Sequence, residues 1–252
     1  METKCIACDE VIEAGDLTAL GETFLAHVRA AHELPYPDTG IRNYAEASQR
    51  LTGPSERLDA IGGVAVHPVT EDRLDDWLAF FDHDAFVGTP EWAACYCTEP
   101  HVRDPRAPEP EDVPHWSANR EDMAERLRGG RAYGYLGYVD GRAVGWVNAS
   151  RRSEYALYRR GPGAEPADEE IVGVSCFIVS PAYRRHGISG ALLDRVIADA
   201  ADRGAAWVEA YPFKEGAEGD AANFRGPRSL YDSRGFEQVK ERERDVVVRR
   251  RA

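Results

Sequence analysis

The sequence predicts an α/β protein of the α+β kind, with a small separate unit at its amino-terminal end. From Val64 onward, short β-branched segments alternate with segments whose apolar residues recur at helical spacing. The dipeptide Asp140-Gly141 is a strong turn signal between two such β segments, and it predicts a hairpin. The first 53 residues have their own helical pattern and end near the break Thr52-Gly-Pro-Ser-Glu56. We therefore expect a unit at 1–53, a linker at 54–63 and a larger domain at 64–252.

Local signals place the elements of the larger domain in order. Thr70 can cap the helix after the first strand, and Gly129-Gly130 ends the next helix. Residues 82–114 are rich in proline, and a loop of that length is usually functional or disordered; its aromatic residues and cysteines favour order. The expected strands are 64–69, 131–139, 142–149, 172–179, 206–211 and a pair within 236–247, and the expected helices are 71–81, 116–127, 190–203 and 226–233.

Composition limits the function classes. The formal net charge of −13 disfavours a broad nucleic-acid surface and suits a cationic substrate such as an amine, although acidity also serves solubility alone. No apolar run is long enough to span a bilayer, and the start of the chain has no secretory pattern, so we expect a cytoplasmic protein without membrane contact. The basic tail at 249–251 is expected to be solvated.

The cysteines suggest metal binding rather than disulfides, because two close pairs and one single cysteine make a poor disulfide framework. Cys5 and Cys8 are followed after eighteen residues by His27 and His32, and this set suits tetrahedral Zn²⁺ although the gap is longer than in most fingers. The alternative is a reduced thiol pair with two surface histidines. Segment 1–53 is acidic, which argues against DNA contact and for a structural or partner-binding role.

The segment 172–200 predicts an anion site. A β-branched run ends at Ser180-Pro181, a glycine-containing turn follows, and an amphipathic helix begins directly after it. Backbone N–H groups and the helix dipole at such a junction can hold a pyrophosphate. The turn and helix start read Arg184-Arg185-His186-Gly187-Ile188-Ser189-Gly190-Ala191, which matches neither a dinucleotide fingerprint nor a P-loop.

These residues resemble the acyl-CoA signature of the GNAT N-acyltransferase superfamily, [Q/R]-x-x-G-x-[G/A]. Arg184 and Gly187 match, whereas Ser189 stands where the family prefers glycine or alanine. A second likeness is the segment Ser229-Leu-Tyr-Asp-Ser-Arg-Gly-Phe236, which resembles the closing LYxxxGF segment of the family. The resemblance implies a mixed, mostly antiparallel central sheet flanked by helices, and it covers roughly residues 64–250.

The resemblance also implies roles for individual residues. Backbone N–H groups from 185–190, helped by Arg184 and Arg185, would hold the pyrophosphate of acetyl-CoA, with His186 more typical of scaffold; a backbone amide at Val179 or Ile178 would polarise the thioester. Tyr231 would protonate the leaving thiolate, unless it is a core residue packed on Phe236. Glu209 is the first candidate for the base, and Glu169 and Glu170 are its rivals.

The expected function is N-acetyl transfer from acetyl-CoA to an amine of a small molecule or peptide. Loops 82–114 and 149–170 are expected to shape the acceptor pocket, with Cys95 and Cys97 lining it or buried beside it. The alternative is an acyl-CoA sensor without catalytic activity, whose finger binds a partner; Tyr231 and the polar loop 214–223 favour catalysis. A homodimer is expected by analogy with the family.

Overall fold

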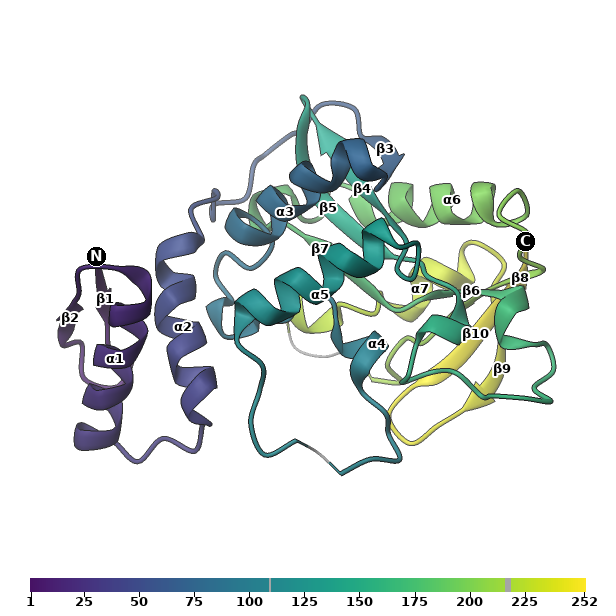
Figure 1. Ribbon diagram of the computed structural model, residues 1–252. Coiled ribbons are helices and arrows are strands. Elements are labelled where there is room, and N and C mark those ends of the chain that lie inside the picture. The colour runs from purple at the N-terminus through teal and green to yellow at the C-terminus, as the bar shows by residue number, and fades with distance from the viewer. Residues whose placement is uncertain (109, 216–218) are drawn as a thin grey trace.

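The computed structural model describes residues 1–108, 110–215 and 219–252, and Figure 1 shows the arrangement of its elements. Glu109 in the expected loop 82–114 and residues 216–218 in the polar loop 214–223 lie outside the described residues. The strands are β1 (Glu2–Lys4), β2 (Val11–Glu13), β3 (Ala65–Pro68), β4 (Gly134–Val139), β5 (Arg142–Asn148), β6 (Ile171–Val174), β7 (Cys176–Val179), β8 (Trp207–Ala210), β9 (Glu237–Glu241) and β10 (Val246–Arg251). The α-helices are α1 (Leu17–Ala31), α2 (Asp38–Arg50), α3 (Leu74–His83), α4 (Glu99–Val102), α5 (Trp116–Arg128), α6 (Ile188–Ala200) and α7 (Arg228–Asp232).

The larger domain contains two four-stranded sheets that meet at Ser175. One sheet has the order β3-β4-β5-β7 and is antiparallel, and the other has the order β6-β8-β10-β9. β6 pairs in parallel with β8 as far as Val174 and Ala210, whereas β7 continues the same run of chain beside β5. The expected single strand at 172–179 is therefore split, and the two sheets diverge beyond Ser175. The predicted mixed, mostly antiparallel architecture with flanking helices is confirmed.

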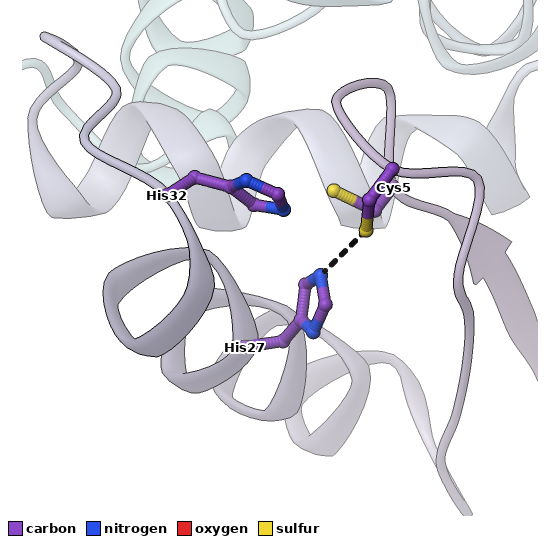
Figure 2. Close-up of side chains that lie close together, drawn as sticks. Cys5, His27 and His32 are labelled. Carbon is purple, nitrogen blue, oxygen red and sulfur yellow. Dashed lines mark hydrogen bonds between the residues drawn. The ribbon is translucent and has the colours of Figure 1, made fainter.

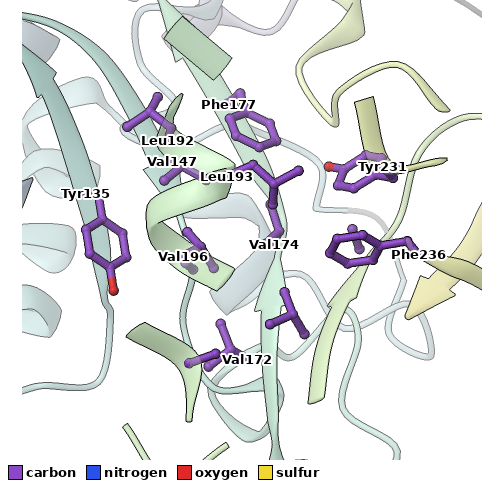
Figure 3. Close-up of a cluster of buried hydrophobic side chains, with 14 of the residues drawn as sticks. Tyr135, Val147, Val172, Val174, Phe177, Leu192, Leu193, Val196, Tyr231 and Phe236 are labelled. Carbon is purple, nitrogen blue, oxygen red and sulfur yellow. The ribbon is translucent and has the colours of Figure 1, made fainter. Parts of the chain in front are cut away.

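Helices cover both faces of the first sheet. The apolar face of α6 buries Leu192, Leu193 and Val196 in a cluster with Val147 and Phe177 (Figure 3). On the other face, α3 and α5 enclose a second cluster that centres on buried aromatic residues such as Trp77 and Trp146. Each fully buried side chain of this size stabilises the fold by about 1.5–3 kcal/mol relative to exposure. The first cluster holds the amino end of α6 against the sheet, where the two sheets diverge.

The β4–β5 hairpin forms as its local sequence predicts, whereas the chain end is held by a residue far away in the sequence. Asp140 and Gly141 both have positive φ, as the predicted two-residue turn requires. The basic tail was expected to be solvated, and this expectation is wrong for Arg249. Residues 249–251 belong to β10, and the Arg249 guanidinium is bound to the Glu209 carboxylate at 2.6 Å.

The N-terminal unit is a β-hairpin packed beside two helices. Asp16 caps the start of α1, because its side chain accepts a hydrogen bond from the Ala19 N–H, and the inner face of α1 buries Leu20, Phe24 and Val28. α2 packs against α1 and also faces the larger domain (Figure 1). The linker is attached as well, because the Leu58 N–H donates to the Ala182 carbonyl. In the described part of the chain, no helix is long and apolar enough to cross a bilayer.

Candidate functional site

A cavity of about 1520 Å³ lies where the two sheets diverge. Its walls come from β7, the turn before α6, the start of α6, the α7 region and the irregular segment around 85–114. The cofactor-binding residues expected from sequence that line it are Ile178, Val179, Arg184, Arg185, Gly187, Ile188, Ser189, Gly190 and Ala191. Segment 149–170, all of which the structure describes, contributes no lining residue, and it contacts the wall only from behind, where the Leu157 N–H donates to the carbonyl of the lining residue Pro100.

The turn before α6 presents backbone donors to the cavity. Arg185 and Gly187 have φ of 69° and 80°, a left-handed conformation that costs glycine little. Gly187 is the N-cap of α6 and has no side chain to accept from the first N–H groups. The first helical hydrogen bond runs from the Ala191 N–H to the Gly187 carbonyl, so the N–H groups of 188–190 precede the ladder. Donors and the helix dipole together suit a phosphate.

Two arginines shape this end of the cavity. The Arg184 Nε donates to the Val179 carbonyl at 3.0 Å, so this side chain braces the turn to the end of β7. Arg234 was missed by the sequence analysis. Its Nε donates to Asp194 at 2.6 Å, and a Cβ on Gly190 would lie 2.8 Å from its Nη2. Only the lack of a side chain at 190 lets this guanidinium sit beside the helix start. Because the turn after α7 brings Arg234 to that point, spacing along the chain could not predict it.

His186 does not line the cavity. Its Nε2 lies 2.9 Å from the Leu58 carbonyl and can donate to it, which ties the linker to the turn. From its place in the turn, His186 was expected among the cofactor-binding residues, in a scaffold position more than a contacting one. The structure places it in that scaffold position.

The end of β7 offers a backbone N–H to the open side of the sheet. Ser180 donates its N–H across to Val144 of the neighbouring β5, whereas the Phe177 N–H points the opposite way, to the Phe224 carbonyl. Because N–H directions alternate along a strand, the Val179 N–H also points away from β5, toward the divergence of the sheets. The Ile178 N–H faces β5. Of the two residues suggested by sequence, Val179 has the geometry to polarise a carbonyl in the cavity.

Tyr231 lies one layer behind the cavity wall. Its ring is fully buried and packs on Phe236 with a centroid distance of 5.3 Å (Figure 3). The hydroxyl donates to the Arg225 carbonyl at 2.6 Å, and a Cβ on the lining residue Gly226 would be 3.0 Å from it. Burial raises the pKa of this phenol well above its usual range, so it keeps its proton at neutral pH.

Glu209 is not placed to act as a base toward the cavity. It is fully buried, and its carboxylate binds Arg152 at 3.1 Å and Arg249 at 2.6 Å and accepts a hydrogen bond from Tyr211. The two guanidinium groups and the Tyr211 hydroxyl occupy both oxygens of this carboxylate, so it has no free oxygen to accept a proton from a substrate. Its rivals Glu169 and Glu170 do not line the cavity either. The strand alternation that suggested Glu209 could not show which face the cavity occupies.

The other end of the cavity has apolar and thiol-bearing walls. Trp92 and Phe224 meet at a centroid distance of 6.1 Å, and Cys95 and Cys97 line the same cavity. Burial raises the pKa of the Cys95 thiol to about 12, so it is a neutral thiol at physiological pH. Cys97 is buried and accepts a weak hydrogen bond from Asn148 at 3.8 Å. Both positions agree with the expected pocket lining.

His101 supports this wall from behind. Its Nδ1–H donates to the Glu154 carbonyl at 3.1 Å, and its Nε2 accepts from the Asn148 amide at 3.0 Å, so the ring is neutral. Burial lowers its pKa to about 4, from 6.5. As the pH falls, His101 is therefore protonated at a higher pH in the unfolded chain than in the folded chain.

The neutral His101 predicts acid-sensitive stability. The free energy of unfolding should be insensitive to this group above about pH 6.5 and should fall by about 3 kcal/mol in total as the pH decreases to about 4. Urea unfolding across that range measures the loss. The variant His101→Gln should remove this part of the pH dependence of the unfolding free energy, whereas His67→Gln, on an exposed strand, should retain it. An unchanged pH dependence in His101→Gln would contradict the role of His101 in acid sensitivity.

The four predicted metal ligands lie together in the N-terminal unit. The ligand atoms of Cys5, Cys8, His27 and His32 are all within 4.8 Å of one another. The side chains converge from the hairpin and the end of α1 (Figure 2), and the Cys8 Sγ is 3.4 Å from the His27 Nε2. Tetrahedral Zn²⁺ with ordinary bond lengths requires a sulfur–nitrogen separation of about 3.6 Å.

The surroundings of the two imidazoles also fit a metal. The Nδ1 of His27 is 3.6 Å from the Glu10 carboxylate. This neighbour favours the tautomer with its proton on Nδ1, which leaves the Nε2 lone pair facing the cysteine sulfurs. In the part of the chain that the structure describes, the His32 Nε2 is buried and has no hydrogen-bond partner. A buried nitrogen lone pair without a donor is costly unless a ligand occupies the space between these residues.

Comparison with known proteins identifies the family. The profile described as "Acetyltransferase (GNAT) family" matches residues 91–219, slightly more than half of the chain. No curated protein matches the chain. Similar solved structures include the GNAT domain of PAT from S. lividans (17% identity, 76% of this chain and 92% of that chain, TM-score 0.48). Another is ribosomal-protein-alanine N-acetyltransferase from Brucella melitensis (19%, 75% and 99%, 0.45). A third is PaiA N-acetyltransferase from Thermoplasma acidophilum in complex with coenzyme A (11%, 76% and 100%, 0.46). The chain thus belongs to the GNAT family of acetyltransferases, which transfer an acyl group from acetyl-CoA.

Proposed function

We propose that this enzyme transfers the acetyl group of acetyl-CoA to a primary amine by direct attack. The observation that carries the proposal is the uncapped start of α6, whose N–H groups at 188–190 lie on the wall of the same cavity as Val179. The diphosphate of the cofactor would bind the turn, with Arg185 and Arg234 at the rim. The pantetheine arm would then run along the open edge of β7 into the divergence of the sheets.

The chemistry follows from this placement. The Val179 N–H would donate to the thioester oxygen and stabilise the negative charge that develops there when the amine attacks. The C–S bond breaks as the amide forms, and the CoA thiolate takes a proton. Tyr231 is the proposed donor because its hydroxyl lies directly behind the lining residue Gly226. To act, it would release its hydrogen bond to the Arg225 carbonyl, and water would afterwards return a proton to the phenolate. The amine proton would pass to water, and the three carboxylates suggested by the sequence would take no part because they do not line the cavity.

A panel assay tests the proposal. The purified chain would be mixed with acetyl-CoA and, separately, with a polyamine, an aminoglycoside, an amino acid and a short peptide. Release of free CoA thiol, with an acetylated product found by mass spectrometry, would support it. Binding of CoA by calorimetry without turnover of any amine would contradict it and would favour an acyl-CoA sensor.

Tyr231→Phe is the matched test of the general acid. We expect kcat to fall by at least about tenfold, because the thiolate then leaves without a positioned proton donor. The affinity for CoA should stay the same, since the ring still fills the core beside Phe236. A kcat within about twofold of the wild type would exclude the role, because general acid catalysis contributes far more than that.

We further propose that Cys5, Cys8, His27 and His32 bind one structural Zn²⁺. The support is the short sulfur–nitrogen contact and the buried lone pair at His32. Segments 1–53, 54–63 and 64–252 remain the proposed division of the chain. A homodimer, a cytoplasmic location and the absence of nucleic-acid binding stay predictions.

A further inference from the structure

Helix α2 of the N-terminal unit forms part of the cavity wall. Gly40 and Asn43 line the cavity beside Val113 and Pro114 of the irregular segment. The turn before α6 and the start of α6, which would hold the cofactor, line the same cavity. Given the proposed function, the region beside α2 is where the acceptor amine would enter. The family profile begins at residue 91, so α2 lies outside the matched range.

Asn43 holds the segment just before α5 with both ends of its amide. The Nδ2 donates to the Pro114 carbonyl at 3.0 Å, and the Oδ1 accepts from the Trp116 N–H at 3.1 Å. Asn43 is only 5% exposed. A buried side chain that satisfies two backbone groups two residues apart fixes the path of the segment between them.

Two neighbouring contacts extend this attachment. Thr39 donates to the Asp112 carboxylate at 2.6 Å, and the buried Glu46 accepts from the Trp116 indole at 2.5 Å. At the end of α2, Arg50 donates to the Tyr96 hydroxyl at 2.8 Å. Tyr96 lies between Cys95 and Cys97, so α2 also supports the thiol-bearing wall.

The opposite side of α2 is attached to the zinc-binding half of the unit. Ser48 donates to the Thr3 hydroxyl at 2.9 Å, and Gln49 donates to the Glu2 carbonyl at 2.6 Å. A Cβ on Gly21 of α1 would lie 2.7 Å from a Glu46 oxygen, so the two helices are in close contact. The proposed metal joins the β1–β2 hairpin to the end of α1, and both of these pack on α2.

We infer that the N-terminal unit is a substrate-positioning element: α2 holds segment 110–116 as a wall of the acceptor site, and Zn²⁺ keeps α2 in place. Loss of either attachment should weaken acceptor binding and leave CoA binding intact. The inference rests on the proposed function, because it requires an acceptor in this part of the cavity.

Asn43→Asp tests the wall directly. The change keeps size and shape but replaces the donor facing the Pro114 carbonyl with a carboxylate oxygen. We expect KM for the best amine of the four-member panel to rise about tenfold, as for one lost buried hydrogen bond. The dissociation constant for CoA, measured by calorimetry, should change by less than about twofold. Gln238→Glu makes the same chemical change on exposed β9 and should alter neither value.

Metal removal tests whether Zn²⁺ keeps α2 in place, and this test needs no acceptor. Hydrogen exchange of the full chain, before and after chelation, should show faster deuterium uptake in 110–116 and unchanged uptake in 188–200. Unchanged uptake in 110–116, or an unchanged KM in Asn43→Asp, would overturn the inference. Equal losses of amine and CoA affinity in Asn43→Asp would also overturn it, because they would indicate a general loss of structure and not a local change at the acceptor wall. Failure of the wild type to bind CoA would instead refute the proposed function.

Discussion

Replacing Gly187 by valine is expected to lower the affinity for CoA by about a hundredfold, because charge-assisted hydrogen bonds at the helix start are lost. Gly187 has φ of 80°, which costs a residue with a side chain about 1–2 kcal/mol and costs a β-branched residue more. No atom lies within 4 Å of a Cβ built there, so the effect does not come from a clash. The chain would relieve the strain by leaving the left-handed region, and this would turn the N–H groups of 188–190 away from the diphosphate.

Gly141→Val is the matched control for this prediction. Gly141 also has φ of 80° and also has open space around its position, but it lies in the β4–β5 hairpin turn. The two variants should lose similar stability, and only Gly187→Val should lose CoA affinity in calorimetry. Equal CoA affinity in both variants would show that the turn before α6 does not hold the cofactor.

Replacing Cys8 by serine is expected to abolish zinc binding and unfold the N-terminal unit. Structural Zn²⁺ sites contribute apparent binding free energies of about 10–16 kcal/mol. A unit of about fifty residues has a core too small to replace that contribution. Elemental analysis should find about one zinc per wild-type chain, in line with four ligands around one ion, and far less in the variant. Limited proteolysis should then cleave within residues 1–50.

The position of Cys8 makes the zinc test specific. Cys8 is exposed, so its replacement by serine removes little packing in the absence of a metal. Cys95→Ser is the control, because Cys95 lies at the cavity and away from the four ligands. This control should keep its zinc and resist cleavage in the first fifty residues. Wild-type protein that contains no zinc when freshly purified would refute the metal site.

The parts of the site that are local in sequence could be predicted. The turn before α6 requires a glycine at Gly187 and small residues after it, and these lie within eight positions of one another. The same holds for the two ligand pairs, because Cys5 and Cys8 are separated by two residues, and His27 in the last turns of α1 is followed closely by His32 at its end. The family likeness of the turn is confirmed by the match to residues 91–219.

Other features depended on which distant segments meet. The alternation in β8 suggested that Glu209 faces the cleft, but Glu209 is buried away from the cavity. Arg152 and Arg249 come from segments far away along the chain and neutralise its carboxylate. Arg234 reaches the start of α6 because Gly190 leaves room for it, and α2 joins the cavity wall through Asn43. No periodicity or spacing encodes these encounters.

Short-range patterns in this chain were therefore enough to predict the fold class, the glycine turn at the start of α6 and the four residues, Cys5, Cys8, His27 and His32, that the structure brings together. Backbone geometry and helical spacing act over a few residues, so a single segment carries that information. The orientation of Tyr231 behind the cavity, the pairing of Glu209 and the contribution of α2 to the cavity wall were decided only when the chain was packed. Burial and charge pairing depend on the partners that three-dimensional packing supplies, and these come from remote parts of the chain.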